Sequence, residues 1–184
     1  MDGITIDKCL KSCKVTKPYY GGIFSIDNIP NYNIKSPCFY IINTDISSGP
    51  GKHWLLLFFL TNGKNLEIFD SLGKSPFAYH KSFKKFLNSK NEWNITYNNK
   101  SLQGDSKVCG AHVLFYAYKK CSKKYGLATI INRYYINNVD LNDCNVLNFV
   151  KSKFKIKNYK LKHLEKSVYK CNLNKIKCNG RRNL

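Results

Sequence analysis

The feature that most constrains the fold is an Asn62-Gly63 pair between two strand-like runs, residues 53–60 (HWLLLFFL) and residues 65–70 (NLEIFD). Asn-Gly tolerates the positive φ angles of a two-residue type I′ turn, so this pattern predicts a β-hairpin. Such a turn pairs Leu55 with Asp70. His53 then lies on the same face as a diagonal neighbour of Asp70, about 7–8 Å away at the backbone. The hairpin therefore predicts an imidazole beside a carboxylate.

A second segment predicts a central buried helix, because residues 109–124 are apolar on nearly every side until Lys119. We expect Lys123, Lys124 and Gly126 to end this helix. Cys109 opens it, and the partial positive charge of a helix N-terminus lowers the pKa of a thiol there. Unpaired N–H groups at the same end can donate to a developing oxyanion.

These segments together predict a site for nucleophilic catalysis. Cys109 is the expected nucleophile, His53 its base, and Asp70 the group that orients the imidazole. Gln103, in a Gly-containing loop, is expected to hold the oxyanion together with the backbone of Cys109. His112, one turn after Cys109, is a second candidate base without an obvious carboxylate partner. Asp70 has an ordinary alternative as the start of an Asp-Ser-x-Gly turn.

The other elements are predicted from periodicity and turn residues. We expect a short helix over 4–13, a buried strand over 38–43, a helix over 77–88 with His80 in solvent, and a half-buried strand over 92–97. Pro18 to Gly22 is typical of a turn or loop. A last helix, capped by Asn142 or Asp143, is expected to run through Val150.

Length favours one domain over residues 1–184. There is no apolar stretch long enough to cross a bilayer and no secretory signal, so we expect a soluble monomer in a reducing compartment, without membrane contact. The eight cysteines are then expected to be mostly free thiols, Cys121 and Cys144 among them as packing residues. Cys9-x3-Cys13 and Cys171-x6-Cys178 do not match the usual zinc spacing, so no metal site is predicted.

The net charge of +20 predicts attraction to polyanions, most plausibly nucleic acid. Residues 151–184 hold twelve Lys or Arg against one acid, Glu165, and interleave them with aromatic residues. This segment favours a DNA-binding face. The candidate DNA contacts are Lys151, Lys153, Lys155, Lys157, Lys160, Lys162, Arg181 and Arg182.

Three motifs resemble the adenovirus endopeptidase (adenain) family, in the clan that also holds SUMO-specific and other ubiquitin-like-protein proteases. They are His53-Trp54 opening a strand, Phe69-Asp70-Ser71-Leu72-Gly73 closing its partner, and Gln103-Gly104 followed by Cys109-Gly110. The chain order His, acid, Gln, Cys is also that clan's order. Weaker similarity extends the resemblance over roughly the first 150 residues.

The resemblance implies an α+β cysteine-protease fold with a central buried helix packed on a mostly antiparallel sheet. It implies a virus-type endopeptidase that cleaves precursor structural or core proteins, usually after small residues such as Gly, in the virion and the host nucleus. It places Trp54, Gly104 and Gly110 next to the substrate. The chemistry requires no cofactor, although DNA and a short viral peptide activate adenain.

This sequence departs from the adenain pattern in two ways, which leave alternative functions open. The interval from Gln103 to Cys109 matches the SUMO-protease form, which keeps a deconjugating protease for ubiquitin-like proteins as an alternative. No cysteine lies between Cys38 and Cys109, so a peptide activator joined by a disulfide just upstream of Gln103 is not predicted. A third possibility, of another class, is a non-catalytic DNA-binding packaging protein on a protease fold.

Overall fold

The computed structural model describes residues 1–31, 34–61, 64–134 and 137–155. Its strands are β1 (Tyr20–Ser25), β2 (Cys38–Asn43), β3 (Trp54–Phe59), β4 (Asn65–Asp70) and β5 (Asn94–Tyr97). Its helices are α1 (Gly3–Ser12), α2 (Lys81–Asn88), α3 (Cys109–Lys123), α4 (Leu127–Ile131) and α5 (Val139–Phe154), with short 3₁₀ helices η1 (Lys17–Tyr19) and η2 (Pro76–Ala78). The α+β class expected from the sequence is confirmed.

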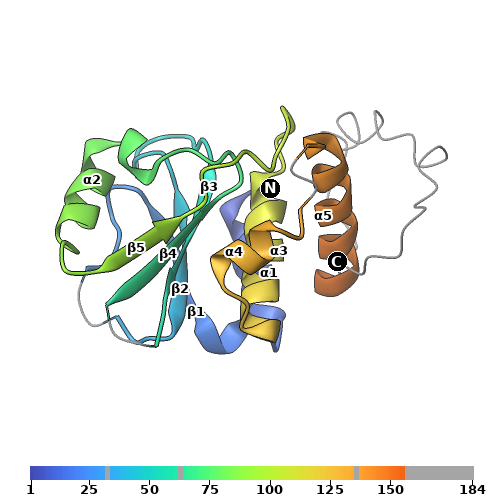
Figure 1. Cartoon of the computed structure of the whole chain (residues 1–184), viewed down its shortest axis with the longest axis horizontal. Helices are drawn as coiled ribbons and strands as arrows, with labels where there is room; N and C mark the ends of the chain where they lie inside the picture. The colour runs from blue at the N-terminus through green and yellow to red at the C-terminus, as the bar shows by residue number, and fades with distance from the viewer. Residues whose placement is uncertain (32–33, 62–63, 135–136, 156–184) are drawn as a thin grey trace.

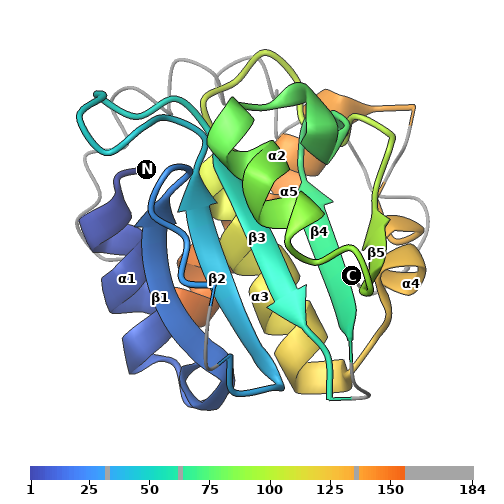
Figure 2. The same ribbon diagram turned by 90° about the vertical axis from the view of Figure 1, so that its left-hand side faces the viewer.

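The five strands form one sheet in the order β1-β2-β3-β4-β5. Strand β3 runs antiparallel to its two neighbours, β2 and β4, and each edge strand lies parallel to the strand beside it. Helices cover both faces: α2 lies over one, and α1, α3, α4 and α5 lie on the other (Figures 1 and 2). The candidate active-site residues of the β3–β4 hairpin lie at the end of the sheet where β3 begins and β4 ends.

Coverage of both faces explains why β3 is apolar at every position rather than at alternate ones. Leu56 and Phe58 pack in the cluster that contains α1, α3 and α5. Leu55, Leu57 and Phe59 pack in the other cluster, with Phe83, Phe86 and Leu87 of α2. Each such side chain contributes about 1.5–3 kcal/mol when fully buried, so the hairpin is fixed in place from both sides.

Helix α3 is the buried central helix that the sequence predicts, and it packs against β3, β4, α1 and α5. Its lysines Lys119 and Lys120 are also buried. Lys120 Nζ lies 2.6 Å from Glu67 Oε2 of β4, and Lys119 Nζ lies 4.9 Å from the centre of the Phe149 ring. Salt-bridge and cation–π contacts therefore offset the cost of burying these two charges.

Some predicted boundaries were wrong. Lys124, with φ +54°, ends α3 in the left-handed conformation, whereas Gly126 precedes α4. Asn138 caps α5 through a 3.0 Å bond from Leu141 N, so Asn142 and Asp143 lie inside that helix and are buried.

Two further segments differ from their predicted form. The helix expected over 77–88 begins at Lys81 after η2, and exposed His80 caps it. Strand β1 begins at Tyr20, inside the expected loop. Two glycines lower the strand propensity of β1, so the strand is stabilised by its parallel pairing with β2 rather than by its own sequence.

The free cysteines of the described segments are Cys9, Cys13, Cys38, Cys109 and Cys121. Cys144 is disulfide-bonded, so the free-thiol prediction was wrong for this residue. In the same segments, no group of three or more His, Cys, Asp or Glu side chains is arranged to hold a metal ion. Among the helices described, none has the length and hydropathy needed to span a bilayer.

Candidate active site

The β3–β4 hairpin brings His53 and Asp70 together as the sequence predicts. Leu55 pairs with Asp70 in the antiparallel register, which confirms the predicted pairing, while the Asn62-Gly63 turn itself lies outside the described residues. His53 comes directly before β3, and its Nε2 lies 2.7 Å from Asp70 Oδ1. Both side chains are buried, so the contact is shielded from water.

Four donors surround the Asp70 carboxylate. Oδ1 accepts from His53 Nε2 and from Leu72 N at 2.8 Å, and Oδ2 accepts from Tyr79 Oη at 2.7 Å and from Lys74 N at 3.0 Å. Burial alone would raise the pKa of Asp70, but these hydrogen bonds and the charge of His53 lower it below its ordinary value. Asp70 is thus held as a carboxylate.

Asp70 also begins the Asp-Ser-x-Gly turn that the sequence offers as its alternative role. Gly73 N donates to Asp70 O at 2.9 Å, and Gly73 has φ +64°. The two interpretations of Asp70, as turn residue and as partner of the imidazole, are therefore both correct. The turn delivers the Leu72 and Lys74 N–H groups to the same carboxylate that contacts His53.

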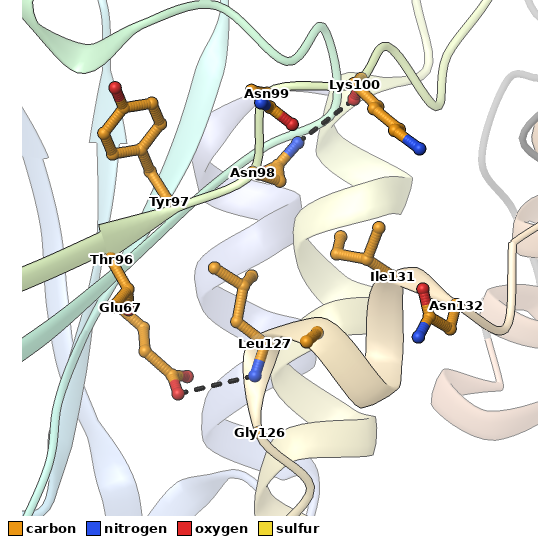
Figure 3. A pocket seen from close by; sticks show the side chains of 11 residues that line it. Glu67, Thr96, Tyr97, Asn98, Asn99, Lys100, Gly126, Leu127, Ile131 and Asn132 are labelled. Carbon is orange, nitrogen blue, oxygen red and sulfur yellow. Dashed lines mark hydrogen bonds between the residues drawn. The ribbon is translucent and has the colours of Figure 1, made fainter.

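Asn98, which the sequence reasoning missed, fixes the backbone of Asp70. Asn98 Oδ1 accepts from Asp70 N at 2.9 Å, and Asn98 Nδ2 donates to Asp70 O at 2.6 Å. The same amide also donates to Lys100 O at 3.2 Å, a bond drawn in Figure 3. The only sequence signal for this role is a polar residue directly after a strand, because the contact spans the β4–β5 crossover.

Cys109 stands at the first position of α3, and its thiol lies beside the imidazole of His53, close enough for each group to shift the pKa of the other. Since His53 Nε2 is bonded to Asp70, Nδ1 is the ring nitrogen left for the thiol. Burial lowers the pKa of His53, but the hydrogen bonds and charges of Asp70 and Cys109 raise it to about 9. Burial raises the pKa of Cys109, but the hydrogen bond and charge of His53 and the N–H of Trp54 lower it below its ordinary value. The pair therefore favours thiolate and imidazolium.

Gln103 lies next to this pair in the loop before α3. Its Oε1 accepts from Ser71 Oγ at 2.7 Å, and its Nε2 donates to Ser106 O. An amide nitrogen carries two hydrogens, so one remains for another acceptor. A cavity of about 620 Å³ opens beside these groups, with His53, Gln103 and Cys109 in its wall.

Two of the three residues expected next to the substrate line this cavity. Trp54 and Gly104 do, and Trp54 Nε1 donates to Met1 O at 3.0 Å. Gly110 does not. A Cβ on Gly110 would lie 2.8 Å from Met1 Cβ and 3.2 Å from Ile6 Cδ1, so Gly110 allows α3 to approach the segment that contains α1.

His112 has a carboxylate partner, contrary to the sequence-based expectation. Its Nε2 lies 2.8 Å from Asp143 Oδ1 of α5, and the ring is fully buried. Burial lowers the pKa of His112, more strongly than Asp143 raises it. His112 does not line the cavity beside Cys109, so the structure assigns it to the contact between α3 and α5 rather than to the base.

A second cavity, of about 530 Å³, lies between β5 and α4 (Figure 3). Glu67 Oε1 accepts from Leu127 N there at 3.4 Å. Its lining residues include Asn98 but neither cysteine nor histidine, so this cavity does not contain Cys109 or His53 in its wall.

The candidate DNA contacts are only partly described. Lys151 and Lys153 lie in the last turns of α5, and Lys155 follows its end, with Lys153 and Lys155 exposed. Lys157, Lys160, Lys162, Arg181, Arg182 and His163 lie outside the described residues.

Comparisons with known proteins give a short sequence match and a partial structural match. No protein-family model matches the chain. A cysteine protease of African swine fever virus is 44% identical over 48 residues, which cover 23% of this chain and 18% of that protein. The chain therefore aligns with less than a fifth of that relative's length. A crystal structure of an African swine fever virus protease superposes with a TM-score of 0.38 and 25% identity, over 61% of this chain and 45% of the other.

Proposed function

We propose that this protein is a cysteine peptidase whose nucleophile is Cys109. The observation that carries the proposal is the row Asp70–His53–Cys109, which begins at a buried carboxylate and ends in a half-buried thiol at the N-terminus of α3, beside a cavity. The similarity to a viral cysteine protease over 48 residues supports the same chemistry.

In the proposed reaction, the Cys109 thiolate attacks the carbonyl carbon of a peptide bond. The oxygen that becomes negative accepts hydrogen bonds from the second Nε2 hydrogen of Gln103 and from the backbone N–H of Cys109. As the C–N bond breaks, the His53 imidazolium gives its proton to the leaving amine. Water then attacks the thioester carbon and His53 takes a proton from it; the C–S bond breaks, which returns the Cys109 thiolate beside the His53 imidazolium and releases the acid product.

The finer assignment is that the substrates are viral precursor proteins, cut after small residues such as Gly during maturation of the virion. Two observations support it. The first is the relation to a viral protease over the aligned segment. The second is the resemblance to adenain in the motifs around His53, Asp70 and Cys109. We place the protein, as a monomer, in the virion and the host nucleus.

We also propose that DNA binds the basic surface and stimulates the enzyme. Burial lowers the pKa of Lys119, and the neighbouring charges of Arg133, Lys153 and Lys123 lower it further. These four side chains therefore form a cationic cluster on α3, α5 and the segment after α4. A phosphate backbone would relieve the repulsion within this cluster.

The test is hydrolysis of a peptidyl-Gly-aminomethylcoumarin substrate by the whole chain. Cys109→Ala should lower kcat/KM by at least about 10³-fold, because no other group of the site can act as nucleophile. Cys121→Ala removes a buried thiol from the same helix and should retain activity. Equal hydrolysis by Cys109→Ala and wild type would contradict the proposal, and no hydrolysis by either would favour the packaging-protein alternative.

The substrate class is tested separately. A ubiquitin-like protein with an electrophile at its C-terminus should label Cys109 far more slowly than a short peptidyl-Gly electrophile if precursors are the substrates. Faster labelling by the folded ubiquitin-like protein would favour the deconjugating enzyme.

Stimulation of peptide hydrolysis by duplex DNA should be lost between about 50 and 200 mM salt.

A further inference from the structure

The loop before α3 holds the side chain expected at the oxyanion, and several groups fix this loop. Ser71 O accepts from Leu102 N at 2.8 Å and from Gln103 N at 3.0 Å. These bonds secure the start of the loop on the β4 side. Beyond Gln103, the loop must be held by other elements.

Asp143 of α5 provides that hold. Asp143 Oδ2 accepts from Gly104 N at 3.2 Å and from Ser106 Oγ. The carbonyl of Ser106 in turn accepts from Gln103 Nε2. Asp143 is therefore connected to the Gln103 amide through one residue, Ser106. Asp143 lies on α5, 39 residues after Gly104, so the contact joins distant parts of the chain.

The other oxygen of Asp143 is also occupied, by His112. With its pKa lowered by burial, His112 is a neutral ring that donates through Nε2 to Asp143 Oδ1. Its Nδ1 is buried and has no partner within the described part of the chain. All three of these neighbours, His112, Gly104 and Ser106, present donors to Asp143, so only a group that accepts on both oxygens satisfies them.

Close packing strengthens this connection. A Cβ on Gly104 would lie 2.9 Å from Asp140 Oδ1 and 3.4 Å from Asp143 Oδ2, so the loop backbone lies directly against α5. Asn142 of the same helix donates to Leu102 O at 3.0 Å. The first turns of α5 thus contact the loop on both sides of Gln103.

We propose that Asp143 is a positioning residue: it holds the Gln103 amide at the oxyanion through Ser106, and it does not take part in forming the thiolate. The inference rests on the proposed peptidase function. Asp143→Asn replaces one accepting oxygen with an NH₂ group, which then faces a donor from His112 or from the loop. The loop is expected to shift, and the Gln103 amide with it.

The test distinguishes a loss of oxyanion stabilisation from a loss of thiolate formation. For Asp143→Asn, kcat on the peptidyl-Gly substrate should fall by about 10- to 100-fold with KM within about 3-fold, a smaller loss than removal of a whole oxyanion donor. The inhibition constant of a peptidyl-glycinal aldehyde should rise by a similar factor. The rate at which iodoacetamide alkylates Cys109 should stay unchanged from pH 6 to 9, because the contact of His53 with Cys109 does not involve Asp143.

A double-mutant cycle identifies the path. In a Gln103→Ala background, Asp143→Asn should cost less than about 3-fold further in kcat, because the amide that it positions is already gone. Ser106→Ala removes the Ser106 Oγ bond to Asp143 Oδ2 and keeps the Gly104 bond to the same oxygen, so it should reproduce part of the loss even if Asp143→Asn folds poorly. Asp7→Asn, an equivalent change on α1 beside Lys11, should retain the wild-type kcat.

Three results would overturn the inference. They are an unchanged kcat in Asp143→Asn and Ser106→Ala, losses that multiply in the Gln103→Ala background, or alkylation of Cys109 that slows in parallel with kcat. Failure of the peptidase proposal looks different, because the wild-type thiol would then show no enhanced alkylation at all, and the positioning role would fall with it.

Discussion

At the scale of single residues, the environment of Asp70 decides what the His53 ring can do. Four donors hold the carboxylate, and Asn98 holds its backbone on both sides. The imidazole is thereby fixed with Nε2 on Asp70 and Nδ1 toward Cys109. Proximity of His53 and Asp70 could be predicted from hairpin register alone. The contributions of Asn98, Tyr79 and Asp143 could not, because each depends on how distant segments pack.

Asp70→Asn is expected to lower kcat/KM by roughly 10²- to 10⁴-fold, since the amide can no longer fix the imidazole tautomer or stabilise the imidazolium. The sign of the pH effect follows from the same contact. Asp70 raises the pKa of His53, so its removal should lower that pKa from about 9. The alkaline limb of the kcat/KM profile should therefore move to lower pH. An alkaline limb at the wild-type position would show that Asp70 does not act on His53.

At the scale of elements, the β3–β4 hairpin and α3 are the parts that their own sequences specify. The register of Leu55 with Asp70 is the one that an Asn-Gly turn predicts, and the buried helix is the one that the apolar run from residue 109 predicts. Strand β1 could not be predicted in this way, because its pairing with β2 is a long-range property. Asp143 was misplaced as a cap for the same reason: its partners His112 and Ser106 lie in other segments.

Gly73→Ala tests whether the turn after β4 holds the site together. Gly73 has φ +64°, and an added Cβ would lie 2.3 Å from the backbone carbon of Lys100. We expect a loss of about 2 kcal/mol or more in the free energy of unfolding, measured by urea denaturation. Gly126→Ala is the matched control, since its φ is −71° and no atom lies within 4 Å of the added Cβ. Similar losses for the two variants would contradict the role of the turn.

At the scale of the whole molecule, the charge of +20 was evident from composition, but its arrangement was not. The cluster of Lys119, Lys123, Arg133 and Lys153 joins residues from separate helices, so it depends on the contact of α3 with α5. The proposed nucleophile, at the first residue of α3, is separate from this basic cluster, so a polyanion bound to the cluster would leave Cys109 open to substrate.

The double variant Lys123→Gln/Lys153→Gln should reduce the slope of log K against log salt for duplex DNA by about 1.8, since each lysine neutralises one phosphate. Fluorescence anisotropy over a salt series measures this slope. Lys81→Gln/Lys84→Gln makes the same change in net charge on α2, across the sheet from α3 (Figure 2), and should leave the slope unchanged. Equal reductions in both variants would assign the effect to overall charge.

Truncation after Lys155 removes residues 156–184 and keeps the whole sequence of α5; Cys144→Ser in the full chain is the control for loss of the disulfide at that residue. This truncation is preferable to removing all of 151–184, because Val150 and Phe154 pack with the core cluster. The peptide-hydrolysis rate without DNA should be unchanged, while the salt slope for DNA should fall further than in Lys123→Gln/Lys153→Gln.

The most direct measurement is alkylation of Cys109 by iodoacetamide across pH, in wild type and in His53→Ala. In wild type, the hydrogen bond and charge of His53 lower the pKa of Cys109, so reactivity should already be high near neutral pH. His53→Ala leaves burial, which raises that pKa, so reactivity should appear only at distinctly higher pH. Overlapping profiles for the two proteins would show that no thiolate–imidazolium pair forms, and the peptidase account would be wrong.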